Sequence, residues 1–162
     1  MQFATFEADG STFALRRARR VDLAGLVALI AADSLRAAEE TPTGGGLEPY
    51  ERAFEAIDAD AAQTLTVLES ADGRVVGTMQ LSSIPGLARR GATRMQIEAV
   101  RVSRELRGLG LGSAMIEWAV GHARDQGAAL VQLTSDARRV DAHRFYERLG
   151  FEASHVGFKL FL

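Results

Sequence analysis

Cysteine is absent from this sequence of 162 residues. Its absence excludes disulfide bonds, thiolate metal ligands and a cysteine nucleophile. The three histidines show no spacing typical of a metal site, so we predict no bound metal. A chain without cysteine suits a reducing compartment, and we therefore expect a cytoplasmic protein.

Long apolar runs and an excess of basic charge are also lacking. No apolar stretch approaches the roughly 18 residues of a membrane-spanning helix, and residues 1–7 lack the basic flank and apolar core of a signal peptide. The net charge of −2 and the pI near 5.9 argue against a nucleic-acid partner. We expect neither membrane nor nucleic acid among the partners, and we interpret the basic run over 16–20 as solvated surface.

The chain is long enough to bury one core, and we expect a single domain over 1–162. Its first part predicts a strand over 12–17 and a helix that opens at Val21 with Asp22 as its N-cap. A glycine-rich break over 41–46 follows, and a second helix begins behind Pro49.

The middle of the chain alternates in the manner of strands. A strand over 64–69, a turn at Asp72-Gly73 and a strand over 74–83 predict a hairpin. Another strand is expected over 93–102. Strict alternation there predicts two faces, one with Met95, Ile97, Ala99 and Arg101 and the other with Gln96, Glu98, Val100 and Val102.

The stretch over 100–113 joins that strand to a glycine-rich turn and then to a helix that we expect from Ser113. Gly108, Gly110 and Gly112 let the backbone approach an anion closely, and the free N–H groups of the helix start point to the same place. Arg107 adds a positive charge. The pattern fits neither the P-loop nor Gly-x-Gly-x-x-Gly, so it predicts a phosphate cradle of another kind.

The last third predicts a helix, a strand, a helix and a strand. The first helix carries apolar residues at 111, 115, 119 and 123, and Gly127 ends it before a strand over 129–134. A strand, crossover helix and strand in this order predict a parallel pair. The second helix buries Ala142, Phe145, Tyr146 and Leu149, and the final strand is expected over 151–162.

Two motifs together resemble the GNAT superfamily of acyl-CoA-dependent N-acyltransferases. Arg107-Gly-Leu-Gly110-Leu-Gly112 matches Arg/Gln-x-x-Gly-x-Gly/Ala, and Ala142-His-Arg-Phe-Tyr146 opens the Ala-x-x-Phe-Tyr-x-x-x-Gly-Phe segment at the right distance. The resemblance covers residues 12 to 160. It implies an α+β, three-layer fold whose central mixed, mostly antiparallel sheet contains a splayed parallel strand pair and carries about four helices. It also implies acetyl-CoA as the acetyl donor.

The resemblance assigns the cofactor contacts. The backbone of the strand around Val100 and Val102 is expected to pair with the pantetheine arm, and the amides of residues 107–113 are expected to bind the pyrophosphate. A strand edge offers donors and acceptors at the repeat of the pantetheine amides. The expected cofactor-binding residues are Val100, Arg101, Val102, Arg107, Gly108, Leu109, Gly110, Leu111, Gly112, Ser113, His143 and Tyr146.

The resemblance also implies the catalytic groups. Tyr146 falls on the family's tyrosine, whose hydroxyl acts as general acid toward the CoA sulfur; the alternative is a packing residue on its helix. Glu98 is our choice of base, directly or through water, and the alternative is a solvated or salt-bridged carboxylate. A backbone N–H near Val100 is expected to hold the oxyanion.

The acceptor is expected to be the primary amine of a small molecule. The C-terminal half resembles aminoalkylphosphonate N-acetyltransferases, and Arg101, Arg138 or Arg139 would then meet an anionic acceptor, or the arginine pair is only exposed surface. Arg139 stands where many members have Asn. The alternatives are a protein or peptide acetyltransferase and a non-catalytic CoA-binding sensor. The apolar end over 158–162 predicts an inward-facing strand, or the seam of a homodimer.

Overall fold

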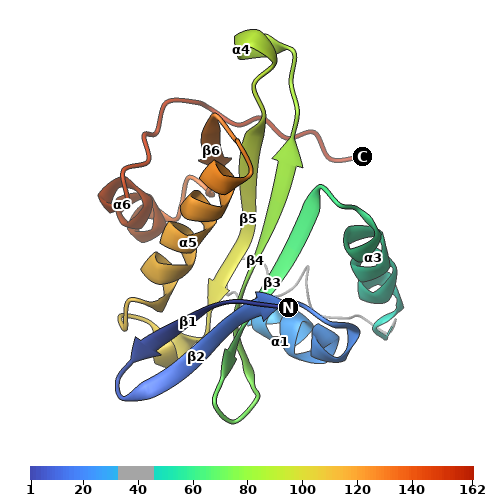
Figure 1. Cartoon of the computed structure of the whole chain (residues 1–162), viewed down its shortest axis with the longest axis vertical. Helices are drawn as coiled ribbons and strands as arrows, with labels where there is room; N and C mark the ends of the chain where they lie inside the picture. Colours follow the sequence, from blue (N-terminus) through green and yellow to red (C-terminus); the bar gives the residue numbers. More distant parts are fainter. Residues whose placement is uncertain (33–45) are drawn as a thin grey trace.

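The computed structural model describes residues 1–32 and 46–162, which form one six-stranded sheet with helices on both of its faces (Figure 1). The strands are β1 (Gln2–Ala8), β2 (Ser11–Arg17), β3 (Gln63–Ser70), β4 (Val75–Ile84), β5 (Arg94–Val102) and β6 (Leu130–Leu133). The helices are α1 (Leu23–Ala31), α3 (Glu48–Ala59), α4 (Ala88–Gly91), α5 (Leu111–Asp125) and α6 (Val140–Arg148), with 3-10 turns η1 (Arg20–Asp22) and η2 (Arg104–Leu106). The predicted α+β class is confirmed. None of these helices is long and apolar enough to cross a membrane.

The sheet is mixed, as predicted. Strands β1 to β5 pair antiparallel in chain order, and β5 pairs with β6 in parallel. The β5–β6 ladder runs only from Arg94 opposite Leu130 to Ile97 opposite Leu133. Because β5 continues to Val102 while β6 ends at Leu133, the two strands part beyond this point. This is the splayed parallel pair that the resemblance implies.

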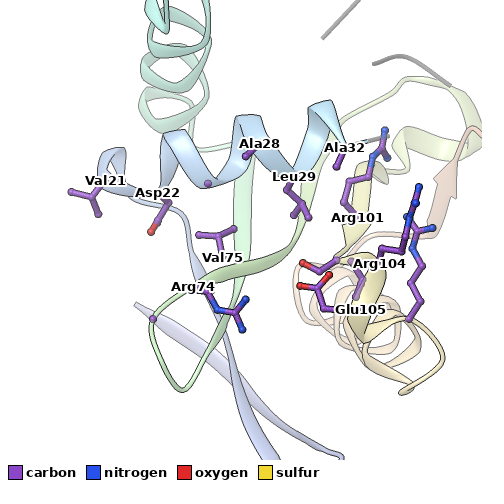
Figure 2. Close-up of a pocket in the computed structure, with 15 residues that line it drawn as sticks. Val21, Asp22, Ala28, Leu29, Ala32, Arg74, Val75, Arg101, Arg104 and Glu105 are labelled. Carbon is purple, nitrogen blue, oxygen red and sulfur yellow. The ribbon is translucent and has the colours of Figure 1, made fainter. Parts of the chain in front are cut away.

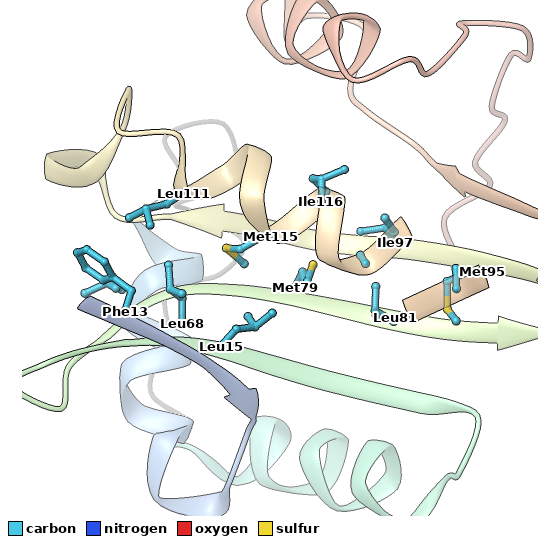
Figure 3. Close-up of a cluster of buried hydrophobic side chains, with 13 residues drawn as sticks. Phe13, Leu15, Leu68, Met79, Leu81, Met95, Ile97, Leu111, Met115 and Ile116 are labelled. Carbon is cyan, nitrogen blue, oxygen red and sulfur yellow. The ribbon is translucent and has the colours of Figure 1, made fainter. Parts of the chain in front are cut away.

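Two hydrophobic layers hold the helices on the sheet. Helix α5 lies along one face, where Leu111, Met115 and Ile116 meet strand side chains such as Met79 and Ile97 (Figure 3). The predicted apolar positions 111, 115, 119 and 123 of α5 are all buried. Helices α1 and α3 cover the lower part of the opposite face around Val67 and Phe54. Burial of each such side chain contributes about 1.5–3 kcal/mol.

Strand β1 is absent from the sequence-based prediction. Its residues alternate weakly, but Phe3 stacks on Trp118 of α5 at a centroid distance of 5.0 Å, and Trp118 in turn stacks on His122 at 5.0 Å. Such aromatic pairs add about 0.5–1.5 kcal/mol beyond the area they bury. The partner that fixes β1 is therefore 115 residues away in the chain, beyond the reach of local pattern analysis.

The basic run over 16–20 is not uniformly solvated, so that interpretation was wrong for Arg16. Its guanidinium is only 8% exposed and donates to both carboxylate oxygens of Asp22, at 2.7 and 2.8 Å, and to Glu69. Asp22 also does not cap α1 through its side chain, because that carboxylate is taken by Arg16 and by the backbone N–H of Arg19 at 2.7 Å. A buried charge is tolerated only when paired in this way.

A bulge in β5 overturns part of the predicted alternation. Ala99 has a φ of 53°, and the register with β4 shifts between Gln80 opposite Glu98 and Thr78 opposite Arg101. One extra residue turns the following side chains over. Val100 consequently packs with Ile97 on the α5 face, and Glu98 lies on the opposite face rather than beside Val100.

The predicted final strand over 151–162 does not form. After Gly150, which ends α6 with a φ of 87°, the segment has no regular secondary structure, and its large apolar side chains from Val156 onward are exposed. An alternating sequence makes a strand only when a free sheet edge pairs with it, and the described residues offer it no such ladder. The predicted glycine-rich break lies outside the described residues except for Gly46.

Candidate active site

The phosphate cradle lies between the end of β5 and the start of α5. Gly108 and Gly110 have φ values of 82° and 81°, a left-handed conformation that glycine adopts without Cβ strain. Helix α5 begins at Leu111, two residues before the predicted start, and its first intrahelical bond runs from the Ala114 N–H to the Gly110 carbonyl at 3.0 Å. The amides of residues 111–113 therefore have no partner within the helix and are available to an anion.

The first turn of α5 lies against α6. A Cβ placed on Gly112 would sit 3.6 Å from Cζ of Phe145 and 3.9 Å from Cγ2 of Val102. A side chain longer than a methyl group would displace that aromatic ring. Gly112 thus allows the first turn of α5 to pack closely against α6, the helix that carries Tyr146. The neighbours contribute differently, because the Leu111 side chain is buried in the core while that of Leu109 is exposed.

A cavity of about 730 Å³ opens beside the cradle, between α1 and the end of β5 (Figure 2). Its basic lining comes from Arg74, Arg101, Arg104 and Arg107. Arg74 pairs with Asp72 at 2.7 Å, whereas no salt bridge within the described residues engages Arg104 or Arg107. Asp22 and Glu105 also line the cavity, but Asp22 is paired with Arg16, so the arginines are in excess and raise the local concentration of anions.

The splayed part of β5 runs from the strand ladder down to this cavity. Arg101 lies beside Ala32, at the end of α1, in Figure 2, and its Nη1 donates to the carbonyl of Val100 at 2.8 Å. Val102 lines the same cavity. The predicted contacts at residues 100–102 and 107–113 therefore form one continuous path along the strand and into the turn.

Tyr146 approaches this path from α6. Its ring packs edge-on against Phe145 and Phe151, with centroid distances of 5.1 and 5.9 Å. Burial raises the pKa of the Tyr146 phenol above its usual value, and the positive charges of Arg101 and Arg139 act in the opposite direction. The hydroxyl is consequently protonated at neutral pH and lies within electrostatic range of the splayed strand.

His143 and Arg138 hold the turn that precedes α6. Nε2 of His143 donates to the carbonyl of Asp136 at 2.9 Å, and the Arg138 guanidinium binds the Asp136 carboxylate at 2.8 and 2.9 Å. These bonds fix the turn between β6 and α6. Neither side chain is a member of a metal-binding cluster among the described residues.

Glu98 is exposed and lies on the face of the sheet that α1 and α3 partly cover. Its cross-strand neighbour is Gln80, while the cavity beside the cradle is lined neither by Glu98 nor by Tyr146. The two predicted catalytic side chains thus come from different elements, Glu98 from β5 and Tyr146 from α6, near the point where β5 and β6 part.

Polar side chains beside Glu98 are missing from the sequence-based site. In register across β3 to β6 lie Gln63, Ser82, Gln96 and Gln132, which we call the amide row. The signal was present in the sequence, because three neighbouring strands carry polar residues two positions apart: 80 and 82, 96 and 98, and 132 and 134. Only the strand order brings them together.

Comparison with known proteins agrees with this architecture. A model of the acetyltransferase (GNAT) family matches residues 31–151. An aminoalkylphosphonate N-acetyltransferase of Salmonella typhimurium is 41% identical over 63 residues, which are 39% of this chain and 41% of that protein. A glucosamine 6-phosphate N-acetyltransferase of Trypanosoma brucei brucei is 38% identical over 81 residues, 50% of this chain and 53% of that protein. The chain thus matches about half of the length of these relatives.

A solved structure described as a transcriptional regulator from Bacillus halodurans C-125 superposes with a TM-score of 0.88. It is 38% identical and covers 93% of this chain and 99% of its own. The matched family model spans most of the chain, including the cradle, both splayed strands and α6. The chain therefore belongs to the GNAT acetyltransferase family.

Proposed function

We propose that the protein is an acetyl-CoA-dependent N-acetyltransferase that moves the acetyl group directly to the primary amine of a small molecule. The observation that carries the proposal is the continuity of the splayed β5 edge with the phosphate cradle. The ladder with β6 stops at Ile97, and free amides begin the helix that follows the glycine turn. A long ligand with amides along one part and phosphates at one end fits this path.

The groups present on the path match the chemistry of acetyl-CoA. Backbone groups of residues 100–102 would hold the pantetheine amides, and the amides of residues 108–113 with Arg107 would hold the pyrophosphate. When bound, acetyl-CoA supplies an activated thioester. The turn held by His143 would support the same ligand from the α6 side.

Tyr146 and Glu98 take opposite proton-transfer roles in this proposal. The raised pKa of Tyr146 keeps its Oη protonated, which suits a general acid toward the departing sulfur. Glu98 accepts a proton from the amine, directly or through water, and its exposure leaves room for that water. A backbone N–H near Val100 would stabilise the developing oxyanion.

The acceptor is proposed to be a small molecule, in a cytoplasmic setting. The two curated relatives are named for an aminoalkylphosphonate and for glucosamine 6-phosphate, which are both small amines with an anionic group. Arg101 faces the cavity and is the arginine best placed for such a group, since Arg138 is bound to Asp136.

We also propose that two copies pair through the C-terminal segment. Val156, Phe158, Leu160 and Leu162 alternate along it and are 80%, 92%, 86% and 117% exposed. Such a series is unfavourable in water and suited to a strand with one buried face. Strand β6 ends the sheet with an open edge, so the segment of one copy would extend the sheet of the other.

Replacement of Tyr146 by phenylalanine tests the general-acid role. The variant keeps the ring contacts with Phe145 and Phe151 but loses Oη. We expect kcat to fall roughly 10²–10⁴-fold with little change in KM for acetyl-CoA. Phe6→Tyr, which alters an aromatic ring of β1 at the edge of the sheet opposite β6, should leave kcat unchanged. Turnover that survives in Tyr146→Phe would refute the assignment.

A further inference from the structure

The face of the sheet that carries Glu98 changes character along the strands. Near α1 and α3 it is apolar, with Leu65 and Val67 in the smaller core cluster. Further along it carries the amide row and Gln80. At the same level the α5 face is fully apolar, with Leu81, Met95 and Ile97 at most 3% exposed. Ser82 and Gln96 are each only 8% exposed. Since buried polar groups need a reason, the glutamines that gather around them on this face are informative.

Gln80 and the side chains of the amide row form two separate hydrogen-bonded groups, which leave specific atoms available. Oε1 of Gln63 accepts from Nε2 of Gln80 at 3.0 Å and from Oγ of Ser82 at 2.6 Å. Oε1 of Gln96 accepts from Nε2 of Gln132 at 2.7 Å. No side-chain hydrogen bond within the described part of the chain uses Oε1 of Gln80 or Nε2 of Gln96. One acceptor and one donor therefore remain, each with its amide held in place by a neighbour.

Both glutamines are neighbours of Glu98 in the register of the sheet. Gln80 lies directly opposite Glu98 across β4 and β5, where Cβ atoms are about 5 Å apart. Gln96 precedes Glu98 by two residues on the same face, roughly 7 Å along the strand. Gln80 and Gln96 are themselves diagonal neighbours, so a small group between them can contact both side chains and remain next to Glu98.

We propose that Gln80 and Gln96 form the specificity-determining floor of the acceptor site, and that they select an amine with a hydroxyl group on the neighbouring carbon. The hydroxyl donates to Oε1 of Gln80 and accepts from Nε2 of Gln96, while the amino group lies at Glu98. This inference rests on the proposed acetyl transfer and names the acceptor class for the same site.

A hydroxyl fits this pair better than a charged group does. An anion would accept from Gln96 but would meet the carbonyl oxygen of Gln80 and the carboxylate of Glu98 without any compensating cation in the row. An ammonium group in place of the hydroxyl would meet only the Nε2 donor at Gln96 and would find no acceptor there. A hydroxyl uses one donor and one acceptor, and an alkyl group in its place would leave both held amides unsatisfied, which is the costly case.

Paired acceptors that differ only in this group test the inference. Ethanolamine is compared with propylamine, and 2-amino-1,3-propanediol with 3-aminopentane, by initial rates of thiol release from acetyl-CoA. Because a hydroxyl on the neighbouring carbon lowers the pKa of the ammonium, kcat/KM is expressed per concentration of unprotonated amine. On that basis we expect it to favour each hydroxylated amine at least about tenfold, equivalent to roughly 1.4 kcal/mol. A ratio near one in the unmodified protein overturns the inference and leaves acetyl transfer intact. If no amine of any kind is acetylated, the proposed function fails as well, so the two failures are distinguishable.

Two isosteric variants and one control locate the effect. Gln80→Met removes the acceptor and Gln96→Met removes the donor, and each should bring the ratio close to one while the KM for acetyl-CoA stays unchanged. Gln2→Met makes the same substitution on β1 at the opposite edge of the sheet and should keep the ratio of the unmodified protein. A melting curve with acetyl-CoA confirms that each variant is folded. An unaltered ratio in both folded variants overturns the assignment of these glutamines.

Discussion

Replacing Asp22 with asparagine should destabilise the protein far more than loss of an exposed carboxylate. The Arg16–Asp22 pair is buried, with exposed fractions of 8% and 6%, and both carboxylate oxygens accept from the guanidinium. Asparagine keeps the volume but removes the charge and one of the two acceptors. Breaking a buried pair costs about 3–5 kcal/mol, and Glu69, which also binds Arg16, should hold the loss near the lower end.

The assay is thermal unfolding at neutral pH. A loss of about 3 kcal/mol in a chain of this size corresponds to a Tm lower by roughly 6–12 °C. Asp58→Asn is the matched control, because Asp58 forms an exposed pair with Arg17 at 3.2 Å, and its loss should cost about 0–1 kcal/mol. Equal effects of the two substitutions would refute the view that this buried pair anchors the start of α1, whose residues line the cavity beside the cradle.

The pH dependence gives the same prediction a second readout. Burial raises the pKa of the Asp22 carboxyl, but the bonds from Arg16 and from the Arg19 backbone outweigh it, so the pKa lies below its usual value. A lowered folded-state pKa contributes stability above the unfolded value of about 3.9, and that stability is lost as the pH falls below it. The Tm difference between the unmodified protein and Asp22→Asn should therefore be constant near neutral pH and shrink below about pH 4.

Three further substitutions test the site and the assembly. Arg107→Glu should abolish the rise in Tm that acetyl-CoA produces, a stabilisation of about 2.7 kcal/mol at a concentration of 100 Kd. The control Arg52→Glu on α3 should keep this rise. An unchanged rise in Arg107→Glu would show that the cradle is not part of the cofactor site. Glu98→Gln should lower kcat, and a kcat equal to that of the unmodified protein would rule Glu98 out as the base. Phe158→Asp should convert a dimer into a 17.4 kDa monomer in light scattering, and a monomeric unmodified protein would contradict the proposed pairing.

Features set by neighbouring residues were predictable from the sequence. Asp72-Gly73 specifies the hairpin of β3 and β4, with Gly73 at a φ of 81°. The spacing of apolar residues fixes the buried side of α5. Gly108 and Gly110 indicate the left-handed turn of the cradle. In each case the cause lies within a few residues of its effect.

Features set by distant partners were not predictable in this way. Arg16 is buried because Asp22 and Glu69 meet it, and the second of these is 53 residues away. The bulge at Ala99 has no local sequence signal, yet it decides that Glu98 and Val100 lie on opposite faces. The amide row depends on the order of four strands. These contacts are tertiary, and periodicity within one segment does not contain them.

Acceptor-dependent release of the CoA thiol, measured together with the mass of the product amine, tests acetyl transfer most directly. The account predicts one acetylated amine for each thiol released, with no acetyl group retained on the protein, and almost no release without an amine. Binding of acetyl-CoA without thiol release for any amine would contradict the account and would instead indicate a CoA-binding sensor.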